Sequence, residues 1–159
     1  SVKTKTWKQY ALGILLTQSI GALSGWLSKD GMKFFSASIS QPPLSPPAVL
    51  FPIVWGVLYA LMGIGAVRIY LSPQSTERSM ALNVYITQLI VNFFWGLIFF
   101  NAQAYLFTFF WLLILWVLVF WMILLFRKVD PLSAKLQIPY LLWLSFAAYL
   151  NLGVWYLNR

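Results

Sequence analysis

Residues 104–126 read AYLFTFFWLLILWVLVFWMILLF and contain no charged side chain. A bilayer-spanning helix needs about 20 predominantly apolar residues, so this stretch is long enough to cross a membrane. Four other stretches meet the same criterion, at about residues 9–27, 48–71, 80–100 and 134–157. The sequence therefore predicts an all-α membrane protein, a bundle of five transmembrane helices that forms a single domain over residues 1–159.

The overall composition supports a membrane protein and excludes several classes of enzyme. Of the 159 residues, 61% are hydrophobic and 9% are charged, whereas soluble proteins carry about 25% charged residues. Histidine and cysteine are absent, which removes the commonest ligands of zinc and haem iron. The three acids, Asp30, Glu77 and Asp130, fall in three separate predicted loops. We therefore expect no catalytic residues, no metal site and no cofactor.

The net charge of +8 comes from cations that flank the apolar stretches. Such cations meet lipid headgroups and set topology, and no basic stripe indicates nucleic-acid binding. Eight cations share one predicted side: Lys3, Lys5, Lys8, Arg68, Arg78, Arg127, Lys128 and Lys135. Three share the other: Lys29, Lys33 and Arg159. This asymmetry predicts an inside amino terminus, and the basic lead without a targeting segment favours a bacterial cell membrane.

The connections between the predicted helices differ greatly in length. The first, about residues 28–47, is a long loop that ends in Gln41-Pro42-Pro43-Leu44-Ser45-Pro46-Pro47. Prolines at this density exclude regular helix and hold the chain extended. The other connections are short, so the second to fifth helices are expected to pack as antiparallel neighbours. Only the first loop is long enough to fold over one end of the bundle.

The third predicted helix carries polar and aromatic side chains on one face. Tyr85, Gln88, Asn92, Trp95 and Phe99 follow steps of three and four residues, so they share that face. Amides in mid-membrane are costly toward lipid, and we therefore expect the face to turn inward. Two interpretations remain open, a hydrogen bond that merely holds the helices together and a polar contact for a ligand.

Two further helices show matching faces. The fifth carries Tyr140, Trp143, Ala147 and Asn151, and the second carries Trp55, Tyr59 and Met62. Rings interleaved with a few amides suit a flat, mostly apolar ligand. The predicted ligand site is therefore Trp55, Tyr59, Gln88, Asn92, Trp95, Phe99, Tyr140, Trp143, Ala147 and Asn151. In residues 104–126 the rings point all round, which predicts a lipid-facing or packing helix.

Two other patterns each allow two interpretations. In the first helix, Gly13, Thr17, Gly21 and Gly25 recur every four residues. This ridge of small side chains predicts either a dimer seam or close packing within the chain. Near the end of the sequence, residues 152–159 match the loose pattern proposed for cholesterol contact, although an aromatic pair with an arginine is also ordinary interfacial anchoring.

Three blocks of sequence are long and specific enough to be compared with a known family. The first is PPAVLFPIVW at residues 46–55, followed by Leu58-Tyr59 and Met62-Gly63. The second is Gln88, Asn92, Trp95 and Phe99-Phe100, and the third is PYLLW at 139–143 with FAAYLN at 146–151. In residues, order and spacing, and over nearly the whole chain, these blocks resemble the translocator protein family (TspO/MBR, tryptophan-rich sensory protein, peripheral-type benzodiazepine receptor), and the chain is similar to a bacterial member.

The resemblance implies a five-helix bundle, often a homodimer, whose cavity is closed on one side by the first loop. Family members bind porphyrins such as protoporphyrin IX, and animal members bind cholesterol and synthetic benzodiazepine-type ligands. By position, the cavity lining falls on Trp55, Asn92, Trp95, Trp143, Ala147 and Asn151, with Gln88 and Tyr59 as further members.

The resemblance leaves more than one function open. Besides binding, sequestering, sensing or transporting porphyrins, some bacterial relatives are linked to light- and oxygen-dependent porphyrin breakdown, which is the alternative. A third possibility is a structural or regulatory partner of other membrane proteins. The chain departs from the family pattern in the first loop, where Gln41 and Leu44 replace a lysine and a tryptophan.

Overall fold

The computed structural model describes residues 2–159, with side chains from Thr6 onward, so the side chains of the expected cations Lys3 and Lys5 lie outside it. The helices are α1 (Val2–Leu27), α2 (Lys29–Ser38), α3 (Leu50–Tyr70), α4 (Thr76–Gly96), the π-helical turn η1 (Leu97–Asn101), α5 (Tyr105–Val129), α6 (Pro131–Lys135) and α7 (Ile138–Asn158). The described residues contain no strand. Five spans are long and apolar enough to cross a membrane. The predicted all-α membrane bundle is confirmed.

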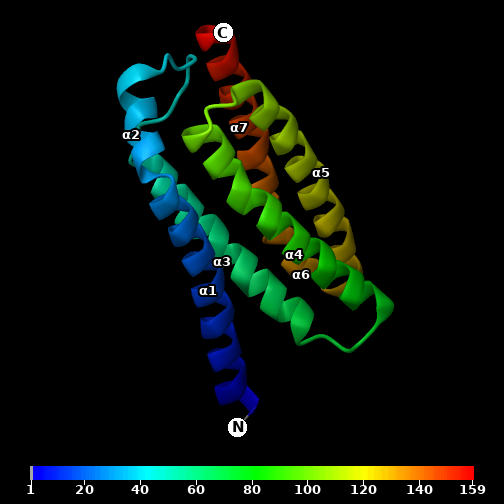
Figure 1. Ribbon diagram of the computed structural model, residues 1–159. Helices are drawn as coiled ribbons and strands as arrows, with labels where there is room; N and C mark the ends of the chain where they lie inside the picture. The colour runs from blue at the N-terminus through cyan, green and yellow to red at the C-terminus, as the bar shows by residue number, and fades with distance from the viewer. Residues whose placement is uncertain (1) are drawn as a thin grey trace.

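The long helices form two groups that lie side by side. Figure 1 shows α1 running along α3, while α4, α5 and α7 lie together on the other side. The closest backbone packing is between α1 and α3, between α4 and α5, and between α5 and α7. By contrast, α7 makes few close backbone approaches to α3 or α4, so large side chains fill the space between them.

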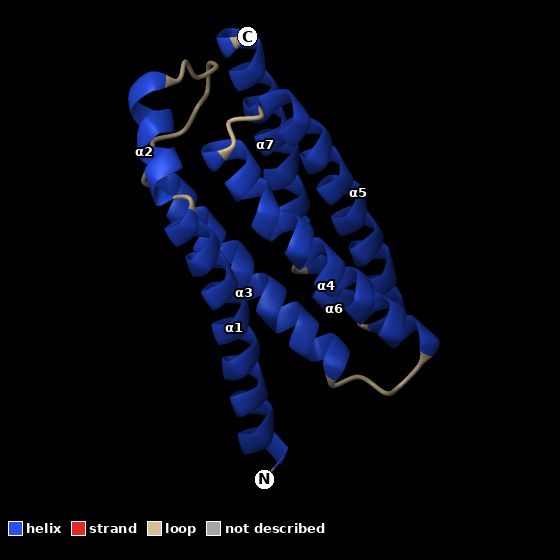
Figure 2. Cartoon of the chain, viewed as in Figure 1, coloured by secondary structure: helices blue, strands red, loops and turns tan. Residues whose placement is uncertain are grey.

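The long first connection is present, but half of it is helical. Helix α2 covers Lys29–Ser38; the turn at Ser28 and the segment from residue 39 to 49 are drawn as loop (Figure 2). The helix is held against η1, where the Phe35 ring lies 5.3 Å from that of Phe99 and 5.4 Å from that of Phe100. It stops before the proline-rich stretch, which is non-helical as predicted.

The small-residue ridge of α1 packs against α3 of the same chain. A Cβ atom on Gly63 would lie 2.9 Å from the Gly13 carbonyl oxygen, so the two backbones cross in direct contact. Thr17 donates a hydrogen bond to the Tyr59 carbonyl at 2.7 Å, and Gly21 lies under the Tyr59 ring. The intrachain interpretation is therefore correct for these positions. Gly25 alone faces open space.

We call the end of the bundle that holds the connection from α3 to α4 and the connection from α5 to α6 the basic end. One ion pair among the described residues joins the helices there. Arg68 of α3 donates from Nε to Asp130 Oδ2 at 2.6 Å and from Nη2 to Oδ1 at 3.3 Å. The Ser133 hydroxyl donates to the same carboxylate at 2.5 Å. The Arg68 hydrogen bond, and then those from Ser133, hold the pKa of Asp130 below its ordinary value against the opposing effect of partial burial. This carboxylate therefore joins α3 to the start of α6.

Candidate functional site

A chain of hydrogen bonds crosses the middle of the bundle. The Tyr59 hydroxyl of α3 donates to Asn92 Oδ1 of α4 at 2.9 Å. Asn92 Nδ2 donates to the Tyr140 hydroxyl of α7 at 2.5 Å, and that hydroxyl donates to Gln88 Oε1 at 2.8 Å. All four side chains are buried. The amide face of α4 therefore turns inward, as the sequence predicts, and links three helices.

Gln88, the last residue in this series of hydrogen bonds, has a donor that is not used. Gln88 is fully buried, and its Nε2 atom has no hydrogen-bond partner among the described residues. A buried polar group in that condition is uncommon, since such groups nearly always find a protein or water partner. Gln88 Nε2 can therefore donate a hydrogen bond to one further acceptor inside the bundle.

Aromatic rings pack against these hydrogen-bonded side chains on the side of the first loop. The Trp55 ring lies 5.5 Å from that of Tyr59 and 6.2 Å from that of Tyr140, with centroids as the reference points. Its centroid is 6.5 Å from that of Trp95, which stacks on Phe99 at 5.4 Å with an interplanar angle of 21°. These rings form one continuous aromatic cluster between α3, α4 and α7.

The second inward amide, Asn151 of α7, lies beside this cluster. Its Oδ1 atom accepts a hydrogen bond from Trp95 Nε1 at 3.4 Å, and its Nδ2 atom donates to the Tyr105 carbonyl at 2.8 Å. Asn151 is buried, as is Ala147 one turn earlier. Ala147 and Asn151 therefore face the interior as predicted, and Asn151 orients the Trp95 ring.

Trp143 is the predicted site residue that stands apart. It is half-buried, and its ring packs on Phe51 at 5.7 Å and on Phe146 at 5.8 Å instead of joining the rings around Trp55. Phe51, which the sequence interpretation missed, precedes Trp55 by four residues and so shares its helix face. Extending the α3 face by one turn would have identified it.

The predicted site is filled by its own side chains. The ring contacts and hydrogen bonds above join most of the lining residues directly, and two pockets of the described residues lie elsewhere, near Ser72 at the basic end. A planar guest would have to part the rings. Because α7 makes few close backbone approaches to α3 or α4, such a movement would break side-chain contacts and leave the helix pairs intact.

The proline-rich segment is strapped to the outer half of α7. The Ser40 backbone exchanges two hydrogen bonds with the Asn158 side chain, at 3.1 and 2.8 Å. The Tyr149 hydroxyl donates to the Pro43 carbonyl at 2.7 Å, and Pro42 occupies the space where Gly153 has no side chain. We call residues 39–45 the strap. Leu44, with a positive φ of 70°, is 81% exposed and points away from the site.

Comparison with known proteins is consistent with this architecture. A model described as the TspO/MBR family matches residues 13–157. The chain is 35% identical over 153 residues to the translocator protein of Ovis aries, covering 94% of this chain and 90% of the relative. It is 37% identical over 122 residues to protein CrtK of Rhodobacter capsulatus, covering 76% of each. It is also 29% identical over 149 residues to the tryptophan-rich protein TspO of Chlorobaculum tepidum, covering 93% and 94%.

Proposed function

The chain belongs to the TspO/MBR family, and on that premise we propose that this multi-pass integral membrane protein binds porphyrins such as protoporphyrin IX. Related flat lipophilic molecules, sterols among them, would use the same site. The site is the aromatic cluster between α3, α4 and α7. Sequestering, sensing and transport all begin with such binding.

The observation that carries the proposal is the way the helices are joined there. Helix α7 makes few close backbone approaches to α3 or α4, and it is joined to them by the ring contact of Tyr140 with Trp55 and the hydrogen bond from Asn92 to Tyr140. A planar aromatic guest can replace ring–ring contacts with contacts of the same kind. Gln88 Nε2 adds a buried donor without a partner in the described structure, which supports hydrogen bonding to an oxygen of the guest.

Fluorescence quenching by protoporphyrin IX tests the proposal. The matched variants are Trp55→Leu, in the cluster, and Trp121→Leu, whose ring is on the exposed surface of α5. We expect saturable quenching of the native protein, a weaker affinity in Trp55→Leu, and an unchanged affinity in Trp121→Leu. Quenching no greater than that of free tryptophan in the same detergent, or equal loss in both variants, would contradict the proposal.

Light- and oxygen-dependent breakdown of porphyrin is the alternative function. The tryptophans that would lie against a pigment are Trp55 and Trp95, since the family's loop tryptophan is replaced by Leu44. Illumination of the complex, with the Soret band and products followed over time, separates breakdown from binding. A product profile equal to that of free pigment would count against this alternative.

We also propose a homodimer in a bacterial cell membrane with the amino terminus inside. The α1 ridge is occupied by α3, so a second copy would use another surface, such as the exposed leucines 12, 15, 16 and 23 of α1. Crosslinking in native membranes tests this proposal. Crosslinks confined to other proteins would instead support the third reading, a partner of other membrane proteins.

A further inference from the structure

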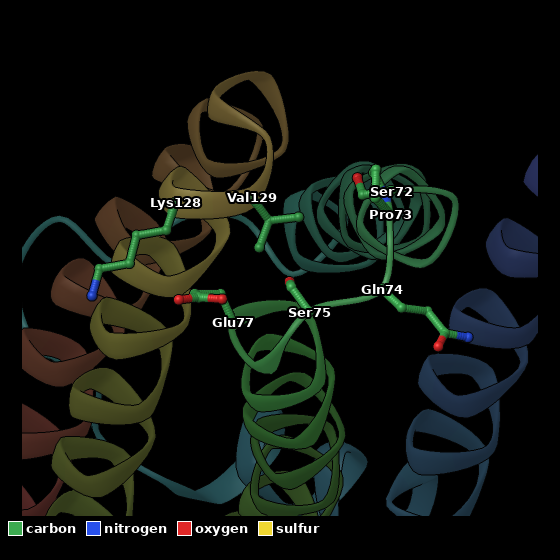
Figure 3. Close-up of a pocket in the computed structure, with 7 residues that line it drawn as sticks. All are labelled: Ser72, Pro73, Gln74, Ser75, Glu77, Lys128 and Val129. Carbon is green, nitrogen blue, oxygen red and sulfur yellow. The ribbon is translucent and has the colours of Figure 1, made fainter.

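A pocket at the basic end of the bundle is separate from the aromatic cluster. It has a volume of about 480 Å³. It lies between the loop that follows α3, the start of α4 and the end of α5 (Figure 3). Its lining consists of Ser72, Pro73, Gln74, Ser75, Glu77, Lys128 and Val129. This site is independent of the proposed porphyrin function.

The pocket contains one acid and one base. Figure 3 shows Glu77 of α4 extending toward α5, the helix that carries Lys128. Among the described residues neither charge has an ion-pair partner, whereas the neighbouring Arg68 and Asp130 are paired with each other. The pocket therefore offers a negative and a positive group to one bound molecule.

One hydroxyl group lies near these charges, whereas the Gln74 amide extends away from them (Figure 3). Ser75 Oγ accepts a hydrogen bond from the Arg78 backbone N–H at 3.1 Å, so its own proton remains available to donate. The Gln74 amide, which is exposed, has no hydrogen bond to the described residues. Lys128 can donate to a phosphate, while Glu77 can accept from an ammonium group.

The surface below the pocket, toward the middle of the helices, is apolar. On α5, Leu124, Trp121 and Val117 precede Lys128 at steps of four, three and four residues, so all lie on its helix face. On α4, Met80 lies three residues after Glu77. All four side chains are exposed. This column suits an acyl chain whose headgroup sits at the level of the pocket.

We infer that this pocket binds phosphatidylethanolamine, with the phosphate against Lys128 and the ammonium against Glu77. Glu77 would repel the headgroup of a purely anionic lipid. The quaternary ammonium of phosphatidylcholine has no N–H to donate to the carboxylate. The charge pair therefore favours a zwitterion with a protonated amine. The apolar column favours a headgroup that carries acyl chains over the soluble headgroup alone.

Lipid retention measured by native mass spectrometry tests this inference on the full chain. The protein is exchanged into detergent with equal amounts of phosphatidylethanolamine, phosphatidylcholine and phosphatidylglycerol of the same acyl composition. We expect phosphatidylethanolamine to be retained about threefold to fivefold more than the other two, the range of one exposed ion pair. Equal retention of the three lipids would overturn the inference.

Variants then locate the effect. Glu77→Gln should abolish the preference over phosphatidylglycerol, and Lys128→Met should lower retention of phosphatidylethanolamine by about threefold. Lys135→Met is the control, since this exposed lysine at the same end does not line the pocket. A Glu77→Gln protein with the native preference would overturn the assignment. So would displacement of the lipid by an equal concentration of soluble phosphoethanolamine, because the acyl column would then contribute nothing.

Discussion

Removing one hydroxyl group from the middle of the bundle tests whether the buried chain of hydrogen bonds holds the helices together. In Tyr140→Phe the ring remains, so the aromatic contact with Trp55 at 6.2 Å is kept. The hydrogen bond from Asn92 and the one to Gln88 are both lost. Gln88 would then have neither of its polar atoms paired among the described residues.

The size of the effect follows from the number and burial of these bonds. Interhelical hydrogen bonds in membranes average about 0.6 kcal/mol, so the loss of two gives about 1.2 kcal/mol. Asn92 and Gln88 are at most 4% exposed, and a buried group left unpaired costs about 1–3 kcal/mol. We therefore expect Tyr140→Phe to lower the free energy of unfolding by about 1–3 kcal/mol.

Reversible unfolding in mixed micelles of mild detergent and dodecyl sulfate, followed by circular dichroism, measures this free energy. The matched control is Tyr85→Phe, a buried α4 tyrosine whose hydroxyl makes no hydrogen bond with the described residues. The control should change the free energy by less than about 0.5 kcal/mol. If the two variants lower the free energy of unfolding by the same amount, the buried hydrogen bonds contribute nothing to stability and the reasoning fails.

Three further predictions concern packing, pH and the strap. Gly63→Ala places a Cβ 2.9 Å from α1 backbone and should lower the unfolding free energy by about 1–3 kcal/mol, whereas Gly56→Ala, with open space around it, should not. Because the folded-state pKa of Asp130 is lowered, its contribution to the free energy of unfolding is present at neutral pH and is lost as the pH falls below about 4. In Asp130→Asn, an acid titration of the free energy of unfolding should no longer show this loss. Gly153→Leu displaces the proline seated on it, so limited proteolysis within residues 39–49 should become faster, and an unchanged cleavage rate would show that the strap does not depend on this notch.

The sequence predicts the membrane-spanning helices well because lipid imposes simple rules. A stretch of 23 residues without a charge, such as 104–126, has few stable states other than a spanning helix. The same rule explains why Gln88, Asn92 and Asn151 were placed inward correctly, since amides in hydrocarbon are costly. Helix faces and inward amides therefore follow from the residue pattern.

Other features depend on distances, which a periodic pattern does not give. The sequence predicts loop for residues 29–38, which are too short and too polar to span a membrane, yet α2 forms there and Phe35 packs on the rings of η1. The α1 ridge fits an intrachain or an intermolecular partner equally well until Gly63 is found against it. Likewise, Trp143 shares a face with Tyr140 and Ala147, yet its ring contacts Phe51 instead of Trp55.

The ends of the bundle differ in how they join α3 to α7, and this difference indicates where a guest would enter. At the basic end, Gln137 is fully buried and donates to the Leu61 carbonyl at 3.0 Å, next to the Arg68–Asp130 ion pair. At the other end α3 and α7 are joined by the ring contact between Phe51 and Trp143 and by the strap, whose hydrogen bonds to Asn158 and Tyr149 are exposed. Exposed hydrogen bonds exchange with water at little net cost, whereas buried ones leave unpaired groups behind. We therefore expect the rings to part from the strap end while the basic end acts as the hinge.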